Sequence, residues 1–203
     1  MSTQYSLTVK NQSTQFGSFC VYQQAPDTNA SNVLTLAWFA KTAHPTSSVT
    51  FTWNLDYNFT WGNQGNLDNE AVFSASQSWP CNPNMRNIVN FNKQGGAYTF
   101  SELSQNTEGD AGSLYISQLG GVVPREAHVG VGMSGSGTFL VEAQPNMKLI
   151  FRPKPTYYLV FGNYTQGQVM DITSLSNVYK LEYGGSVQNI DMVLNADNMW
   201  SQP

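Results

Sequence analysis

Charged residues are scarce in this sequence. Asp, Glu, Lys and Arg make up 11% of its 203 residues, and the formal net charge is −4. The basic residues are scattered apart from a short cluster at Lys148, Arg152 and Lys154, whereas a nucleic-acid interface needs a dense basic patch. We therefore expect no nucleic-acid partner, and a surface that is polar through the abundant Asn, Gln, Ser and Thr.

Cysteine and histidine are also rare. Cys20 and Cys81 permit one disulfide or two free thiols, and the sequence leaves both open, although disulfide-dependent folds use cysteine more densely. The two histidines, His44 and His128, are far apart in the chain and far from the cysteines. No convergent set of ligands for a transition metal results. For calcium, Glu108 with Asp110, Asp68 with Glu70 and Asp191 with Asp197 lie in or near polar turns but lack the ligand spacing of a known loop. We expect neither a metal nor another cofactor.

Long apolar runs are missing from the chain. No segment approaches the ~20 apolar residues of a membrane-spanning helix, so we expect no spanning segment. The start, MSTQYSLTV, has no basic region followed by an apolar one, so no secretory signal is visible. This predicts a protein that is cytoplasmic or exported by a leaderless route.

Helical periodicity is absent as well, whereas period-two alternation is frequent. Residues 49–61, VTFTWNLDYNFTW, place aromatic and aliphatic side chains at every odd position and Thr, Asn or Asp at every even one. This pattern predicts a strand with one face on a core and the other face polar, as in an antiparallel sheet. Because the run exceeds the usual strand length, we expect it to bend and to serve two packing partners.

Shorter alternating segments follow one another along the rest of the chain. Residues 5–9, 16–23, 34–41 and 70–77 are predicted strands, and further strands follow from residue 113 at a spacing typical of a β-sandwich. We find no linker and no internal repeat. The sequence therefore predicts an all-β fold, a two-sheet antiparallel β-sandwich of jelly-roll-like or Greek-key type with little helix, as a single domain over residues 1–203.

One glycine-rich segment invites a catalytic interpretation. GVGMSGSG, residues 130–137, fits neither a nucleophile elbow nor a phosphate loop, because Ser134 lacks the second flanking glycine and no Lys is followed by Ser or Thr. Glycines within strands more often mark a bulge or a close approach of backbones. A hydrolase built from His128 and Ser134 is the enzyme alternative, and we reject it. We expect no enzyme and no catalytic residue.

Aromatic residues outside the long strand are the best candidates for a binding site. Trp79, Trp38, Tyr164 and Trp200 are assigned to loops or strand ends. An exposed ring beside amide groups is a usual platform for a sugar face or a partner side chain. The alternative is that these rings cap the ends of the sandwich. The basic cluster is open to two interpretations in the same way, contact with an anionic partner or protection of a strand edge.

Several long segments resemble the RhiA family, rhizosphere-expressed proteins of root-nodule bacteria. The resemblance is carried by LAWFAKTAHPTSSVTFTWNLDYNFTW, FSASQSWP, GGAYTF, GSLYI, VGVGMSGSGTFLVEAQPNMKL, YYLVFGNYTQGQVMDIT and LNADNMWS. It implies a bacterial protein made in a host-associated setting. It implies no activity, because the family offers no catalytic motif to transfer.

These observations lead to one functional expectation and two alternatives. We expect a non-enzymatic bacterial protein that acts in host or matrix interaction by binding carbohydrate. The first alternative is a self-assembling structural protein that forms homo-oligomers, filaments or inclusions, with residues 5–9 and the segment ending at Trp200 near the contacts. The second is a membrane-active toxin, because an amphipathic strand such as residues 49–61 can also insert into lipid.

Overall fold

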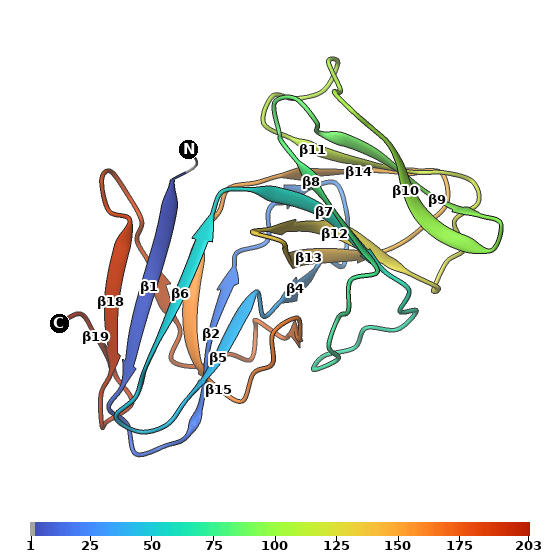
Figure 1. Cartoon of the computed structure of the whole chain (residues 1–203). Helices are drawn as coiled ribbons and strands as arrows, with labels where there is room; N and C mark the ends of the chain where they lie inside the picture. The colour runs from blue at the N-terminus through green and yellow to red at the C-terminus, as the bar shows by residue number, and fades with distance from the viewer. Residues whose placement is uncertain (1–2) are drawn as a thin grey trace.

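Strands are the regular structure of the described part of this chain. The computed structural model describes residues 3–203, and within these residues there is no helix. Nineteen strands form four sheets, and the sheets pack in two pairs (Figure 1). The predicted all-β class and sandwich packing are confirmed, with the difference that the chain builds two sandwiches where the pattern suggested one.

The first pair of sheets, here called the terminal sandwich, is built from both ends of the chain. One sheet has the order β19 (Trp200–Ser201), β18 (Asn189–Leu194), β1 (Gln4–Asn11) and β6 (Ser48–Asn54). The other has the order β17 (Tyr179–Leu181), β15 (Tyr157–Gly162), β2 (Gly17–Gln23) and β5 (Phe39–Ala43). Their facing side chains form one buried core, which includes Leu7, Phe19, Phe51, Leu159 and Met192.

The second pair, the middle sandwich, is built mainly from the middle of the chain. One sheet has the order β10 (Ala97–Ser104), β9 (Ile88–Gln94), β11 (Leu114–Gln118), β14 (Met147–Arg152) and β3 (Asp27–Thr28). The other has the order β16 (Val169–Met170), β4 (Leu34–Leu36), β13 (Ser136–Glu142), β12 (His128–Met133), β7 (Tyr57–Gly62) and β8 (Gln77–Cys81). Phe59, Phe91, Ile116, Val129 and Phe151 lie in its buried core.

The chain passes repeatedly between the two sandwiches. It crosses from β2 to β3, from β4 to β5, from β6 to β7 and from β14 to β15, and it returns through β16. Pairing is antiparallel except for two parallel pairs, β1 with β18 and β9 with β11. That residues 1–203 form a single domain stays a prediction.

The long alternating segment joins the two sandwiches. It breaks at Leu55 and Asp56, so that β6 belongs to the terminal sandwich and β7 to the middle one (Figure 1). The predicted bend and the two packing partners are confirmed. Its aromatic side chains are core residues of two separate clusters, Phe51 and Trp53 in the first, Phe59 and Trp61 in the second. The apolar face that motivated the toxin alternative is therefore occupied by internal packing.

The outer face of β7 is covered, unlike that of β6. Thr50 and Thr52 of β6 are exposed, whereas Asn58 and Thr60 of β7 are buried. Residues 63–76, here called the cover loop, pack Leu67 and Phe73 into a small apolar cluster on this sheet, with Phe73 against Gly62 of β7. That cluster contains Leu36, Leu67, Phe73, Leu140 and Val169.

The strand predicted at residues 70–77 is wrong. Only a single bridge, Val72 with Gln168, interrupts the cover loop before β8 begins at Gln77. Phe73 produced the apparent alternation, yet its side chain anchors the loop against Gly62, where an added Cβ would lie 2.5 Å from the ring. A loop of this length that packs through its own side chains is often functional.

The N-terminal strand has no free edge. β1 pairs with β18 on one side and with β6 on the other, so its backbone groups are used within the chain. β19 is an edge strand of the same sheet. The segment that we expected near contacts between copies is therefore ordered by intramolecular pairing. Assembly into oligomers or filaments stays a prediction.

The glycine-rich segment forms the β12–β13 hairpin. Its turn uses left-handed backbone at Ser134 (φ 52°) and Gly135 (φ 78°), and the register shifts between Val131 and Gly132. At Gly130 an added Cβ would lie 2.0 Å from the Phe139 carbonyl oxygen. The interpretation as a bulge with closely approaching backbones is confirmed.

Both cysteines are free thiols. Cys20 is buried in β2 of the terminal sandwich, and Cys81 is partly buried in β8 of the middle sandwich. Burial raises the pKa of the Cys20 thiol and raises the pKa of Cys81 to about 12. Of the two possibilities that the sequence left open, the structure has the two thiols.

Candidate functional site

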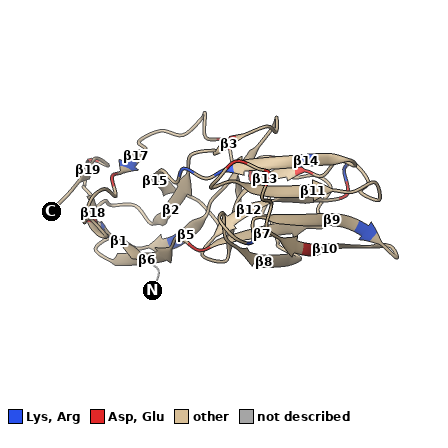
Figure 2. Cartoon of the chain, turned by 90° about the horizontal axis from the view of Figure 1, so that it is seen from above, with Lys and Arg blue, Asp and Glu red and all other residues tan. Residues whose placement is uncertain are grey.

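The cover loop borders three hollows in the surface. The first, of about 550 Å³, contains Tyr164 and is here called the Tyr164 hollow. The second, of about 360 Å³, contains His128 and is called the His128 cleft. The third is an open groove of about 600 Å³ above Trp61 and Tyr98. Charged residues are spread over both sandwiches (Figure 2), so charge alone singles out none of the three.

Tyr164 lies just after β15, with its ring held against the end of that strand. An added Cβ on Gly162 would lie 2.8 Å from the Tyr164 ring, so the absence of a side chain at Gly162 lets the ring approach the backbone closely. The ring also packs on a small cluster that includes Cys20 and Met170. It is therefore fixed on one side and half-exposed on the other, as a stacking platform requires.

The Tyr164 hydroxyl is a neutral hydrogen-bonding group. Burial, and after it the neighbouring Cys20 thiol, raises its pKa above the ordinary range of tyrosine. It forms no hydrogen bond within residues 3–203. The hydroxyl can therefore donate to a ligand or accept from one at neutral pH.

Polar side chains with spare hydrogen-bonding capacity surround the ring. Asn69, Glu70 and Asn163 line the hollow and form no side-chain hydrogen bond among residues 3–203. The Gln168 Oε1 accepts from the Thr165 amide at 2.9 Å, which leaves its Nε2 group as a donor. The hollow therefore offers both donors and acceptors beside an aromatic face.

Asp171 contributes a fixed carboxylate to the same hollow. Its Oδ1 accepts from the Thr173 hydroxyl at 2.6 Å and from the Thr173 amide at 3.1 Å. These hydrogen bonds, the hydroxyl one first, lower the pKa of Asp171, so the group is ionised at neutral pH. Its Oδ2 forms no hydrogen bond within the described residues and remains an acceptor.

Glu70 reaches the hollow from strained backbone. Its φ of 71° lies in the left-handed region, which is uncommon for a residue with a side chain. The Glu70 amide donates to the Val169 carbonyl at 3.0 Å, and the Ala71 amide donates to the Asp68 carbonyl at 3.0 Å. The cover loop thus holds Glu70 beside β16 and places its carboxylate at the hollow.

Two of the other predicted residues are committed to packing. Trp38 lies between β4 and β5, is 0% exposed and donates from Nε1 to the Met133 carbonyl at 2.9 Å, so its ring has no surface to offer a ligand. Trp79 lies in the edge strand β8, where we had predicted a loop, and its ring packs 5.8 Å from that of Phe100. Trp79 is a half-buried rim residue of the middle core.

Trp200 lies in the edge strand β19. Its Nε1 donates to the Asn177 carbonyl at 2.8 Å, and its ring is 6.0 Å from that of Phe19. The structure therefore does not bring the four predicted residues together, because Trp79 belongs to the middle sandwich and Trp200 to the terminal one. Tyr164 alone of the four lines a hollow rich in polar groups.

The polar residues of the Tyr164 hollow were missed by sequence reasoning. They come from the cover loop and from residues 163–174, two polar segments about a hundred positions apart that looked like ordinary turns. The bridge between Val72 and Gln168 joins the two segments. The polar composition of NYTQGQ at residues 163–168 was the one local signal.

The suspected hydrolase pair is not assembled. His128 lies at the start of β12, and Ser134 lies beyond its other end, where its hydroxyl donates to the Asn54 carbonyl at 2.9 Å. Among residues 3–203 no three His, Cys, Asp or Glu side chains are placed to hold a metal ion. The same residues contain no helix with the length and apolarity to cross a membrane.

Comparison with known proteins places the chain in a family. The sequence model described as RhiA matches residues 2–202. Protein RhiA of Rhizobium leguminosarum bv. viciae is 39% identical over 202 residues, which cover 98% of this chain and 85% of that protein. No solved structure matches the chain. The relative is bacterial, and the match spans both sandwiches from end to end. The chain belongs to the RhiA family.

Proposed function

We propose that this protein is a non-enzymatic binding protein whose Tyr164 hollow holds a carbohydrate of the host or of the surrounding matrix. The observation that carries the proposal is the half-exposed ring of Tyr164, which lies against Gly162 among polar groups with hydrogen-bonding capacity left unused within residues 3–203. A sugar ring has an apolar face of C–H groups and a rim of hydroxyls, and it needs both kinds of contact.

The polar groups of the hollow suit hydroxyls better than a single charged group. Tyr164, Asn69 and Asn163 can each donate and accept, whereas Glu70 and Asp171 only accept. Each hydroxyl of a sugar also donates one hydrogen and accepts others. A volume of about 550 Å³ lies within the usual range of ligand sites and leaves room for one or two sugar units.

Binding assays on variants of Tyr164 test this proposal. A glycan array, followed by calorimetric titration with plant-wall polysaccharides and their oligosaccharides, identifies the ligand. Tyr164→Ala should then lower affinity roughly tenfold or more, because the stacking face is lost. Tyr164→Phe, which keeps the ring and removes the hydroxyl, should keep most of the affinity.

A matched control comes from a second half-buried tyrosine of the same sandwich. Tyr158 stacks on Tyr22 with ring centroids 5.3 Å apart and does not line the hollow. Tyr158→Ala should leave affinity unchanged, and circular dichroism should show all three variants folded. The proposal fails if no glycan binds more tightly than about millimolar, or if Tyr164→Ala binds like wild type.

A further inference from the structure

The His128 cleft carries a second inference, independent of the Tyr164 hollow. It lies between residues 65–68 of the cover loop, the ends of β12 and β13, and residues 29–34. Its lining contains two carboxylates and an imidazole but no Lys or Arg. A cleft with this composition offers acceptors and negative charge to whatever enters it.

His128 lines the cleft with an imidazole that has one nitrogen unpaired within the described residues. The residue is 5% exposed, and its Nδ1 lies 2.7 Å from the Gln64 carbonyl oxygen. Because a carbonyl oxygen only accepts, Nδ1 carries the hydrogen, and Nε2 of the neutral ring is therefore an acceptor. Within residues 3–203 this Nε2 has no hydrogen-bond partner.

Two carboxylates line the same cleft. Glu142 is the cross-strand partner of His128 in the β12–β13 pair, so both residues belong to one end of that hairpin. Its Oε1 accepts from the Gln144 Nε2 at 2.6 Å, which leaves Oε2 without a partner in the described chain. Asp68 comes from the cover loop, and its side chain forms no hydrogen bond among those residues.

We propose that the His128 cleft binds a small organic ligand through a protonated amine. An ammonium group donates N–H hydrogen bonds and accepts none, and the lining of the cleft supplies acceptors of two kinds, Nε2 of His128 and the carboxylate oxygens of Asp68 and Glu142. Its positive charge compensates the two carboxylates, which no basic residue of the lining neutralises. Charge-assisted hydrogen bonds of this kind are about twice as strong as neutral ones.

Titration with matched small molecules tests the proposal. The probes are 4-amino-1-butanol and 1,4-diaminobutane, with 1,4-butanediol as the uncharged molecule of the same shape. Chemical-shift changes of isotope-labelled protein at neutral pH and low salt should saturate with both amines, and they should map to residues around His128. The diol should show no saturable shift.

Two isosteric substitutions test the role of the carboxylates. Asp68→Asn and Glu142→Gln should each weaken amine binding roughly tenfold, because each replaces a charge-assisted contact by a neutral one. Neither should disturb the fold, since Asp68 has no side-chain hydrogen bond within residues 3–203 and Gln at 142 can still accept from Gln144. Glu108→Gln is the control, because it changes the net charge equally at an exposed position outside the cleft.

The outcomes separate this inference from the proposed carbohydrate function. Tyr164→Ala should leave amine binding unchanged, and Glu142→Gln should leave glycan binding unchanged. The inference is overturned if the amines do not saturate, if the diol binds as well as they do, or if Glu108→Gln weakens binding as much as the cleft variants. None of these results bears on the Tyr164 hollow.

Discussion

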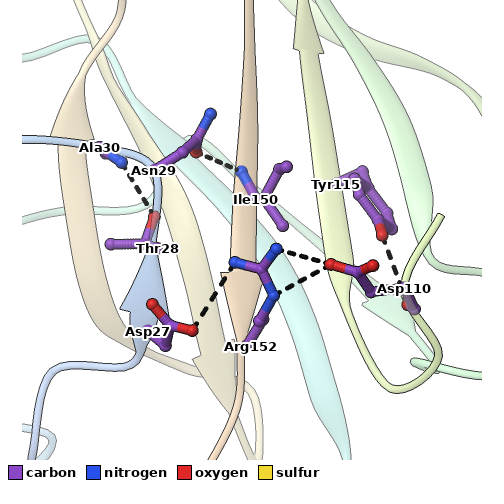
Figure 3. A network of polar contacts seen from close by, with 8 residues as sticks. All are labelled: Asp27, Thr28, Asn29, Ala30, Asp110, Tyr115, Ile150 and Arg152. Atoms are coloured by element: carbon purple, nitrogen blue, oxygen red, sulfur yellow. Dashed lines mark hydrogen bonds and ion pairs between the residues drawn. The ribbon is translucent and has the colours of Figure 1, made fainter.

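Arg152 donates two hydrogen bonds to the carboxylate of Asp110. Its Nη2 donates to Asp110 Oδ2 at 2.6 Å, and its Nε donates to the same oxygen at 3.1 Å (Figure 3). On its other side, Nη1 lies 3.8 Å from Asp27 Oδ2. Arg152 therefore ties β3 and the segment before β11 to the end of β14.

This arrangement clarifies the basic cluster noted in the sequence. Arg152 is engaged by two carboxylates, and the Lys148 ammonium lies 5.0 Å from the centre of the Tyr115 ring. Nearby, the side chain of Asn29 bonds the backbone along one edge of β14. It accepts from the Ile150 amide (Figure 3) and donates to the Lys148 carbonyl. Intramolecular partners therefore account for Lys148 and Arg152, which favours protection of the sheet edge over an anionic partner.

Removal of the Asp110 carboxylate should loosen one segment without unfolding the protein. In Asp110→Ala, amide hydrogen exchange in residues 105–112 should accelerate, because the hydrogen bonds from Arg152 that hold this segment are lost. The melting temperature should stay close to that of wild type, because the pair is exposed and screened by solvent. Asp27→Ala, which removes only the longer contact, should leave exchange in that segment unchanged. A large fall in melting temperature would contradict this prediction.

Trp79→Ala should affect stability and not glycan binding. The ring covers the rim of the middle core beside Phe100, so its removal should lower the free energy of unfolding by about 1 to 3 kcal/mol, less than for a fully buried tryptophan. Urea unfolding measures the change, and Trp79→Phe should recover part of it. Weaker glycan binding by a folded Trp79→Ala protein would contradict this prediction and would indicate that Trp79 contacts the glycan.

Gly130→Ala should destabilise the β12–β13 hairpin severely. The new methyl group would meet the Phe139 carbonyl oxygen and the Leu140 Cα, which are backbone atoms of the paired strand and have no room to move aside. We expect a loss of about 3 kcal/mol or more, or insoluble protein. Gly184→Ala is the matched control, since nothing lies within 4 Å of its added Cβ, and it should unfold like wild type.

The raised pKa values of the two thiols predict that the protein loses stability at alkaline pH. Burial raises the pKa of Cys20 and Cys81 in the folded protein above their ordinary value of 9.0, for Cys81 to about 12. Above pH 9 the unfolded chain therefore releases thiol protons that the folded chain keeps. The free energy of unfolding therefore keeps its full contribution from the thiols below pH 9. It falls as the pH rises from 9 toward the thiol pKa values of the folded protein.

Urea unfolding between pH 9 and 10 measures this effect. The slope should approach about 1.4 kcal/mol per pH unit for each thiol that ionises only in the unfolded state. Tyrosines such as Tyr22, whose pKa burial raises from 10.0 to about 12, add to the slope increasingly as the pH nears 10, so the share of one thiol is the difference in slope between wild type and a cysteine variant. Cys81→Ser should reduce the slope by the share of one thiol, and an unchanged slope would show that Cys81 ionises while folded.

The sequence by itself determined the local pattern of strands. Alternation in residues 49–61 and the length of that run predicted both a strand and its bend, because side-chain direction in a strand depends only on position along the backbone. The glycines of residues 130–137 likewise predicted closely approaching strands. In the cover loop the same logic failed, since Phe73 satisfied the alternation while its segment packs as a loop.

Only the tertiary structure decided which polar groups meet and which rings stay exposed. Trp38 and Tyr164 both follow strands and were both expected to be exposed, yet Trp38 is fully buried and bonded to Met133, whereas Tyr164 lies against Gly162 beside a hollow. Asn69 and Glu70, which line the hollow with Tyr164, come from the cover loop about a hundred residues away in the sequence. The pairing of Val72 with Gln168 joins that loop to the segment that follows Tyr164. The hollow forms only when long-range strand pairing brings these two segments together, and local sequence propensity does not determine that pairing.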